Sequence, residues 1–304
     1  MTNRSARLFL SILTSLVLIA AGWYIYSYSR PAQPEIDPAT FNGQRAYADV
    51  ETQVGFGPRI PGTEGHTKIR EWMRDELVAV GWQVEVQESE ALGHPIKNVI
   101  AKRSDEPPQI ILGAHYDTRM FADNDPNPEN HKKPVPGAND GGSGVAVLLE
   151  LARTLPEDTV PIWLVFFDAE DNGNIKGWDW TLGSPEFVRN NPVQPQAVVI
   201  VDMIGDADLN IYKEHNSNPD LMAKLWRTAR SLGYGGKFIS EYKHSMFDDH
   251  RPFLQAGIPT VLIIDFDYPY WHTLQDTPDK VSAESLQAVG KTLLVWVMQQ
   301  SGQP

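Results

Sequence analysis

The chain contains no cysteine. This absence excludes a disulfide framework, a thiolate metal site and a cysteine nucleophile. Any metal ion must therefore be bound through nitrogen and oxygen ligands. Basic side chains are also scarce, because 26 Lys and Arg stand against 39 Asp and Glu, which gives a formal net charge of −13. We expect no nucleic-acid partner, since binding to a phosphate backbone requires a basic surface.

Charge is missing altogether from residues 8–28, which read LFLSILTSLVLIAAGWYIYSY. A helix of about 20 apolar residues spans the hydrocarbon core of a bilayer. Arg4 and Arg7 precede the segment, which favours a short cytoplasmic N-terminus at residues 1–7. We therefore expect a transmembrane signal-anchor that attaches the protein to the membrane in a single pass and leaves the rest of the chain extracytoplasmic. The alternative is a signal peptide cleaved near Ala20, which would give a secreted protein.

The remaining chain divides into a Pro-rich linker, residues 29–40, and one catalytic domain, residues 41–304. Apolar periodicity predicts helices and short buried strands that alternate along this domain. The helices are expected at 64–80, 145–155, 221–232 and 281–299, and the strands at 82–87, 98–101, 110–113, 160–167, 197–201 and 260–264. This alternation predicts an α/β domain with a mixed, mostly parallel central sheet and helices on both faces.

Five short motifs place a metal-ligating or acid–base side chain beside glycine or at the end of an apolar run. They are Gly-Ala-His115-Tyr-Asp117, Gly-Ala-Asn-Asp140-Gly-Gly-Ser-Gly, Phe-Phe-Asp168-Ala-Glu170-Asp171, Val-Asp202-Met-Ile-Gly and Tyr-Trp271-His272-Thr. Polar ends of parallel strands are where open α/β sheets carry their active sites. Two histidines and several carboxylates gathered there predict a zinc site.

Each motif also has a simpler interpretation. Asp140 lies among glycines and suits a tight turn. Glu170 and Asp171 are adjacent carboxylates that repel each other unless a cation lies between or beside them, but a solvated acidic loop is the alternative. His272 is surrounded by aromatic residues and could be a packed core histidine. The other histidines outside a strand-end context are expected at the surface; they are His66, His131, His215 and His244.

As an ordered set, these motifs resemble those of the co-catalytic zinc aminopeptidases and of their relatives, the zinc-dependent glutaminyl cyclases (glutaminyl-peptide cyclotransferases). The resemblance covers roughly residues 45–300 and implies a zinc exopeptidase-like fold and peptide or protein N-termini as substrates. The residue roles that it implies for a cyclase are one zinc held by Asp140, Asp171 and His272, an acid–base Glu170, and a supporting carboxylate pair of Asp202 and Asp248. In an aminopeptidase, a second zinc would be held by His115 and Asp202, with Asp140 bridging the two ions.

Three features favour the cyclase. Trp271 before His272 resembles the cyclase pocket tryptophan, Asp248-Asp249 is a doubled Asp typical of cyclases, and the stretch 177–184 is similar to a Trp-containing cyclase segment. Asp171, where animal cyclases have Glu, and the Gly-Gly-Ser-Gly run after Asp140 favour the peptidase. We expect a zinc-dependent cyclase that converts N-terminal glutamine to pyroglutamate and releases ammonia, with Trp271 against the substrate. A di-zinc aminopeptidase is the alternative, and the complete ligand set disfavours a non-catalytic peptide-binding ectodomain.

Overall fold

The computed structural model describes residues 41–302. The predicted N-terminal segments 1–7, 8–28 and 29–40 lie outside the described residues, so the expected membrane span stays a prediction. Within residues 41–302, none of the helices has the length and apolar character needed to cross a membrane.

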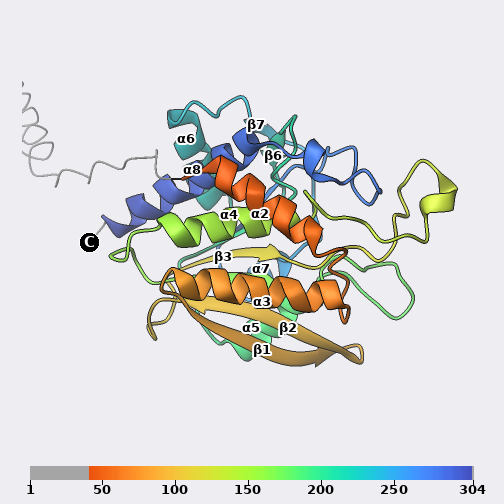
Figure 1. The fold of residues 1–304 in the computed structure, drawn as a ribbon. Helices are drawn as coiled ribbons and strands as arrows, with labels where there is room; N and C mark the ends of the chain where they lie inside the picture. The colour runs from red at the N-terminus through yellow and green to blue at the C-terminus, as the bar shows by residue number, and fades with distance from the viewer. Residues whose placement is uncertain (1–40, 303–304) are drawn as a thin grey trace, which may run out of the picture. The chain divides into compact units, whose positions relative to one another are not determined.

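A six-stranded sheet forms the centre of the described domain, in the order β1-β2-β4-β3-β5-β8 (Figure 1). The strands are β1 Gln83–Ala91, β2 His94–Lys102, β3 Ile110–His115, β4 Ile162–Phe167, β5 Ala197–Asp202 and β8 Thr260–Ile264. β4, β3, β5 and β8 pair in parallel, whereas β2 is antiparallel to both β1 and β4. The predicted mixed, mostly parallel sheet is confirmed. Two short strands, β6 (Ile211–Lys213) and β7 (Phe238–Tyr242), form a separate parallel pair.

Helices cover both faces of the sheet, as predicted. Alternate residues of each central strand enter different apolar clusters: Ile110 and Leu112 of β3 face one, and Ile111 faces the other. The first cluster is completed by α2 (Gly43–Gly55), α3 (Glu64–Ala79), α4 (Gly142–Thr154), α6 (Pro219–Ser231) and α8 (Ala283–Ser301). The second is completed by α5 (Gly183–Asn190) and α7 (Arg251–Gln255). In Figure 1, α2, α4 and α8 are seen together on one side of the sheet.

Helices α2 and α5 and strands β6 and β7 were not predicted. Helix α2 buries Ala46 and Val50 together with the polar Asp49 and Gln53, so its buried face does not read as an apolar stripe. Helix α4 begins after Gly141, without a side-chain cap, and Ser143 Oγ donates to Asn139 O at 2.6 Å.

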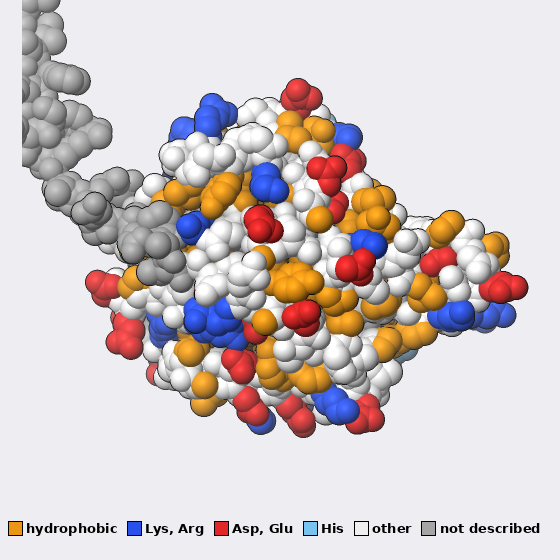
Figure 2. Space-filling view, turned by 45° about the horizontal axis from the view of Figure 1, so that its top comes forward, with side chains coloured by type: hydrophobic (Ala, Val, Ile, Leu, Met, Phe, Trp, Pro, Cys, Tyr) orange, Lys and Arg blue, Asp and Glu red, His pale blue; other side chains and the backbone are white. Residues whose placement is uncertain are grey.

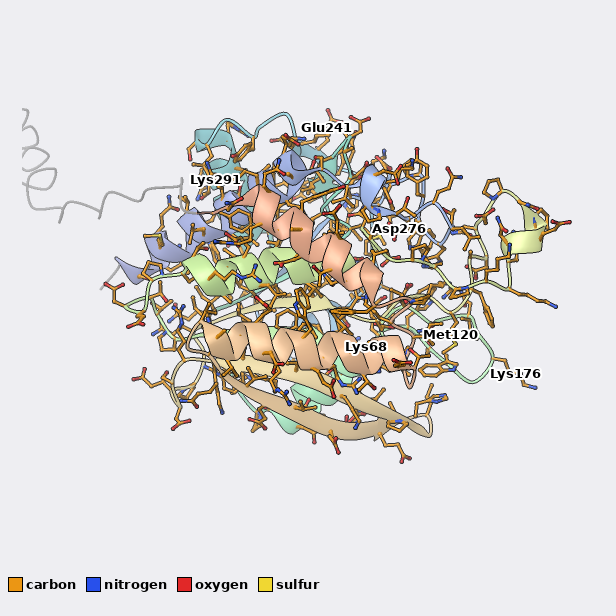
Figure 3. All side chains as sticks on the ribbon, in the orientation of Figure 1. Lys68, Met120, Lys176, Glu241, Asp276 and Lys291 are labelled. Atoms are coloured by element: carbon orange, nitrogen blue, oxygen red, sulfur yellow. The ribbon has the colours of Figure 1, made fainter. Side chains whose placement is uncertain are left out.

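The parallel strands bring four chain segments to one edge of the sheet. Because β4, β3, β5 and β8 run in the same direction, their carboxyl ends meet there. Figure 3 labels Met120, Lys176 and Asp276 on the loops at this end of the molecule. On the face shown in Figure 2, basic and acidic side chains are interspersed rather than gathered by sign. The motifs identified in the sequence meet at this edge because they follow the carboxyl ends of the parallel strands.

Candidate active site

Two groups of buried side chains are arranged like metal ligands at this edge. His115 Nε2 lies 3.1 Å from both Asp140 Oδ1 and Asp202 Oδ1. His272 Nε2 lies 2.8 Å from Asp171 Oδ1 and 3.7 Å from Asp140 Oδ2. Asp140 therefore belongs to both groups and presents one carboxylate oxygen to each histidine. The fold brings together every metal-ligating residue expected for either alternative, one ion or two.

The backbone around these ligands is held in uncommon conformations. His115 and Asp202 are the last residues of β3 and β5, and Asp171 follows β4 by one short loop. Asp140 lies in the turn before α4, where Gly141 has φ +79° and a Cβ would come 2.8 Å from Asp117 O. His272 itself has φ +56°. A non-glycine residue with positive φ is uncommon, and such strain gathers at functional sites.

The donor set fits a divalent cation held by nitrogen and oxygen. Asp140 Oδ2 and Asp171 Oδ2 are both buried and have no hydrogen-bond partner. Leaving buried carboxylate oxygens unpaired is costly, and a cation between them removes that cost. Burial, with a further contribution from Asp140, raises the pKa of Asp171 to about 6. Imidazole and carboxylate ligands without thiolate suit zinc. Both unpaired oxygens belong to the group of Asp140, Asp171 and His272, so this group is the better candidate site.

Glu170 lies beside the ligands without being one of them. Its side chain is 7% exposed and lines the same pocket as Asp140 and Asp171. Burial raises the pKa of Glu170 well above its usual range; His115 opposes this shift, and the Asp248 carboxyl adds to it. A carboxyl group whose pKa approaches the working pH can both accept and return a proton. The geometry therefore suits the acid–base role predicted for Glu170.

Asp248 and Asp202 lie in the same pocket, as the resemblance implies. Burial raises the pKa of Asp248 well above its usual range, and Asp202 and Asp249 raise it further. A carboxyl group that keeps its proton can donate a hydrogen bond to a neighbouring carboxylate. Asp202 also contacts His115. The predicted supporting pair is thus close to Glu170, and Asp202 remains shared between that pair and the His115 group.

The pocket has one acidic wall and one apolar wall. Its volume is about 180 Å³, which is small beside the roughly 300–1,000 Å³ of sites for drug-sized ligands. The apolar lining consists of Trp180, Met203, Met246, Phe247, Ile264, Phe266 and Trp271. The Trp271 ring lies 5.0 Å from the Phe266 ring and 3.9 Å from the His272 ring. A pocket of this size and lining suits a single amino-acid side chain.

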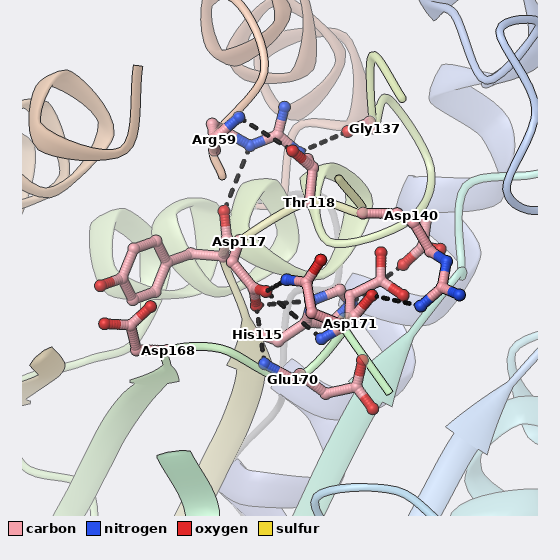
Figure 4. Close-up of polar contacts among 12 residues, drawn as sticks. Arg59, His115, Asp117, Thr118, Gly137, Asp140, Asp168, Glu170 and Asp171 are labelled. Carbon is pink, nitrogen blue, oxygen red and sulfur yellow. Dashed lines mark hydrogen bonds and ion pairs between the residues drawn. The ribbon is translucent and has the colours of Figure 1, made fainter. Parts of the chain in front are cut away.

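Asp117, which the first sequence motif contains but to which no role was assigned, is a positioning residue. This fully buried carboxylate accepts hydrogen bonds from Glu170 N at 3.0 Å, Asp171 N at 3.3 Å and Asn172 Nδ2 at 3.2 Å (Figure 4). Its Oδ1 also lies 3.4 Å from His115 Nδ1. Asp117 therefore orients the acid–base residue, one metal ligand of each group and their loop. Its spacing two residues after His115, at the end of a strand, was the available signal.

Asp276 is a second positioning residue, and it holds the turn that carries Asp140. It accepts hydrogen bonds from Asn139 N at 2.8 Å, Asp140 N at 3.1 Å and the Tyr268 hydroxyl at 2.8 Å. In the sequence it follows His272 by four positions, in His-Thr-x-x-Asp. Most of the hydrogen bonds that the Asp276 carboxylate accepts thus come from backbone N–H groups of the turn that carries Asp140.

Two buried arginines tie the site loops together, and no sequence signal marked them. Arg59, drawn in Figure 4, donates to the carbonyl oxygens of Tyr116, Pro136 and Gly137. Burial lowers the pKa of Arg59 to about 10, which still leaves it charged at neutral pH. Arg119 donates to the carbonyl oxygens of Asp171 and Gly173. Both guanidinium groups also place positive charge close to the cluster of carboxylates.

The prediction that His66 is a surface residue is wrong. His66 is 3% exposed, and its Nε2 lies 2.7 Å from Asp168 Oδ1. Its ring stacks on Tyr116 with 5.1 Å between centroids. No local signal marks this contact, because His66 lies in the first turn of α3 whereas Asp168 follows β4, about a hundred residues later. Of the other three histidines, His215 is exposed.

We expect Asp117→Ala to weaken zinc binding by about 10–100-fold, the usual effect of removing a residue that orients metal ligands. The backbone N–H groups of Glu170 and Asp171 would lose their acceptor, so the loop would no longer hold Asp171 in place. Zinc titration in a competitive chelator buffer measures the change. Asp49→Ala is the control, because Asp49 is also buried but pairs with Arg153 between α2 and α4. Equal loss of zinc affinity in both variants would show a general stability effect instead.

Comparisons with known proteins agree with this geometry. A profile of Peptidase family M28 matches residues 98–297, well over half of the chain. The glutaminyl cyclase of Porphyromonas gingivalis is 37% identical, with a TM-score of 0.80 over 86% of this chain and 99% of that protein. A leucine aminopeptidase precursor from Bacteroides thetaiotaomicron is 36% identical, with a TM-score of 0.79 over 85% of this chain and 97% of that one.

A curated relative extends the comparison to animals. The glutaminyl-peptide cyclotransferase of Bothrops jararaca is 25% identical over 296 residues, which cover 79% of this chain and 77% of the relative. The predicted resemblance to glutaminyl cyclases and their zinc exopeptidase fold is therefore confirmed. This chain belongs to peptidase family M28.

Proposed function

We propose that this protein is a zinc-dependent glutaminyl-peptide cyclotransferase that converts the N-terminal glutamine of peptides or proteins to pyroglutamate. The observation that carries the proposal is the pocket itself. Buried Glu170 lines the same pocket as Trp271 and as Asp140 and Asp171, two members of the ligand group that His272 completes. The cyclases among its relatives, in bacteria and in animals, support the same activity.

The chain's own residues account for the proton transfers. Asp140, Asp171 and His272 would hold the zinc ion, which would supply Lewis-acid polarisation of the substrate's γ-carboxamide. Glu170 accepts a proton from the substrate α-ammonium group, and the freed amine attacks the carboxamide carbon of the same residue. Glu170 then returns this proton to the amide nitrogen as the bond from that nitrogen to the carbon breaks, which releases ammonia. The ring nitrogen gives its second proton to the freed Glu170 carboxylate, from which it leaves with ammonia as ammonium. No external nucleophile is required, so orientation of the glutamine is the main task of the pocket.

The apolar wall separates cyclisation from hydrolysis. Trp271 packs against the methylene groups of glutamine and keeps water from the carboxamide carbon. Trp180 also lies beside the ligand His272, with 5.9 Å between ring centroids and nearly parallel planes at 15°. The two indole rings thus confine the space around the reacting atoms.

A di-zinc aminopeptidase is the second candidate, and a specific observation supports it. The group of His115, Asp140 and Asp202 is complete and buried. In that enzyme Glu170 would activate water, and the peptide bond after the first residue would be cut. The cyclase is preferred because the unpaired carboxylate oxygens lie in the other group and because the pocket is small and walled by tryptophan.

The direct test is incubation of the purified protein with Gln-X and Leu-X peptides, followed by mass analysis. A cyclase releases ammonia from Gln-X without cleaving it and leaves Leu-X intact. Release of a free amino acid from either peptide would identify a peptidase and contradict the proposal.

We expect Glu170→Gln to lower turnover of Gln-X by about 10²–10⁴-fold, since the amide keeps the shape of the side chain but removes the base. Zinc content should not change, because Glu170 is not assigned as a ligand. Glu186→Gln is the matched control: Glu186 on α5 is equally buried, at 6% exposed, and pairs with Arg189 outside the pocket. Near-normal turnover in zinc-loaded Glu170→Gln would rule out the acid–base role.

Elemental analysis should find about one tightly bound zinc per chain. His272→Ala should lose this ion because it removes a ligand from the group with the unpaired oxygens. His115→Ala should retain it. Two tightly bound ions, one of them lost in His115→Ala, would favour the aminopeptidase.

We also propose that residues 8–28 anchor the enzyme in the membrane, with the catalytic domain extracytoplasmic. The support is the uncharged apolar run and the preceding Arg4 and Arg7. Full-length protein should sediment with membranes and require detergent for release. Deletion of residues 1–30 should yield an active protein in the supernatant, whereas aggregation of that variant would show that the segment packs on the catalytic domain.

A further inference from the structure

Phe247 is the most exposed aromatic side chain among residues 41–302, at 58%. It nevertheless lines the active-site pocket, directly before Asp248. An exposed apolar ring is unfavourable in water, and such rings at the rim of a pocket commonly contact a ligand. The mechanism described above gives Phe247 no role. Its position therefore requires an explanation beyond the chemistry of the glutamine residue.

The loop that carries Phe247 is held firmly on both sides. Before it, Met246 N donates to Glu214 Oε1 at 3.0 Å, and Met246 O accepts a hydrogen bond from Asn216 Nδ2 at 3.3 Å. After it, Asp249 Oδ1 accepts a hydrogen bond from Ser184 Oγ at 2.5 Å. Glu214 is fully buried and also accepts from Ser217 N at 2.7 Å. Phe247 is thus presented at the rim by a pinned backbone, which reduces the entropy cost of using it for binding.

We propose that Phe247, with Met246 beneath it, forms the subsite for the second residue of the substrate and gives the enzyme a preference for apolar side chains there. This proposal rests on the proposed cyclase function. When the N-terminal glutamine occupies the pocket, with its amine at Glu170, the chain must leave over the rim. The pocket-lining residue most open to solvent on that route is Phe247.

Charge at the site sharpens this preference. The pocket below the rim is lined by five carboxyl groups and by no lysine or arginine; they are Asp140, Glu170, Asp171, Asp202 and Asp248. An acidic second residue would gain no contact from an apolar ring and would lose part of the hydration of its own charge beside that ring. An aromatic or aliphatic second residue would cover the Phe247 ring and remove apolar surface from water. The expected order of preference is therefore aromatic or aliphatic, then glycine, then acidic.

The test compares three peptides of equal length, Gln-Phe-Ala, Gln-Gly-Ala and Gln-Glu-Ala, by the rate of ammonia release. For the wild-type protein we expect kcat/KM for the Phe peptide to exceed that for the Gly peptide by about 5–10-fold, mainly through a lower KM. In Phe247→Ala this ratio should fall to about two or less. Phe247→Leu should restore most of it, because an aliphatic side chain still offers an apolar surface.

Tyr242→Ala is the matched control. Tyr242 is also an exposed aromatic residue, at 49%, and lies five positions earlier at the end of β7, outside the pocket lining. It should keep the wild-type ratio. A wild-type ratio near one, or an unchanged ratio in Phe247→Ala, would overturn the subsite while leaving the cyclase activity in place. If the wild-type protein cyclises none of the three peptides, the proposed function itself fails, and the subsite with it.

Discussion

The concentration of buried negative charge around Asp140 is the constraint on which the rest of the site depends. Seven further acidic side chains are buried nearby: Asp117, Glu170, Asp171, Asp202, Asp248, Asp249 and Asp276. Burial of a carboxylate is costly unless hydrogen bonds or opposite charge compensate for it. Arg59 and Arg119 provide part of that compensation, and backbone N–H groups provide more. The oxygens that remain unpaired are on Asp140, Asp171 and Asp249, and those of Asp140 and Asp171 lie in one ligand group, where a bound cation would satisfy both.

The ligands are divided between the ends of strands and the loops that follow them. Strand β3 ends at His115 and β5 ends at Asp202, whereas the other ligands lie in segments whose backbone N–H groups point at carboxylates. Asp117 and Asp276 serve as acceptors for those segments, so each of them holds a turn and a ligand at once. Second-layer hydrogen bonds of this kind fix ligand orientation and tune affinity. The parallel sheet brings the ligand-bearing segments to a common edge, and Asp117 and Asp276 fix the orientation of the segments there.

The parts predicted from sequence were those with strong local signals. Buried β-branched strands, and polar residues at their ends, indicated both the sheet and the ligands His115 and Asp202. Helix α2 was missed because its buried face contains Asp49 and Gln53, and the buried position of His66 was missed because its partner is distant in sequence. Arg59 binds carbonyl oxygens, which any residue can supply, so no pattern of side chains reveals it. Arg119 also binds carbonyl oxygens, in addition to its ion pair with Asp123. Polar contacts between residues far apart in the chain therefore could not be predicted from the sequence.

Ligand identity alone does not separate a cyclase from a peptidase in this family. The same carboxyl group, Glu170, can take a proton from an amine or from water, so the outcome depends on which nucleophile reaches the carbonyl carbon. Trp271 lines the pocket beside Glu170, where the proposed mechanism uses it to keep water from the carbonyl carbon. The intramolecular amine also has the advantage of proximity. In the proposed mechanism, control of water access by the apolar wall, rather than a change of ligands, decides between cyclisation and hydrolysis.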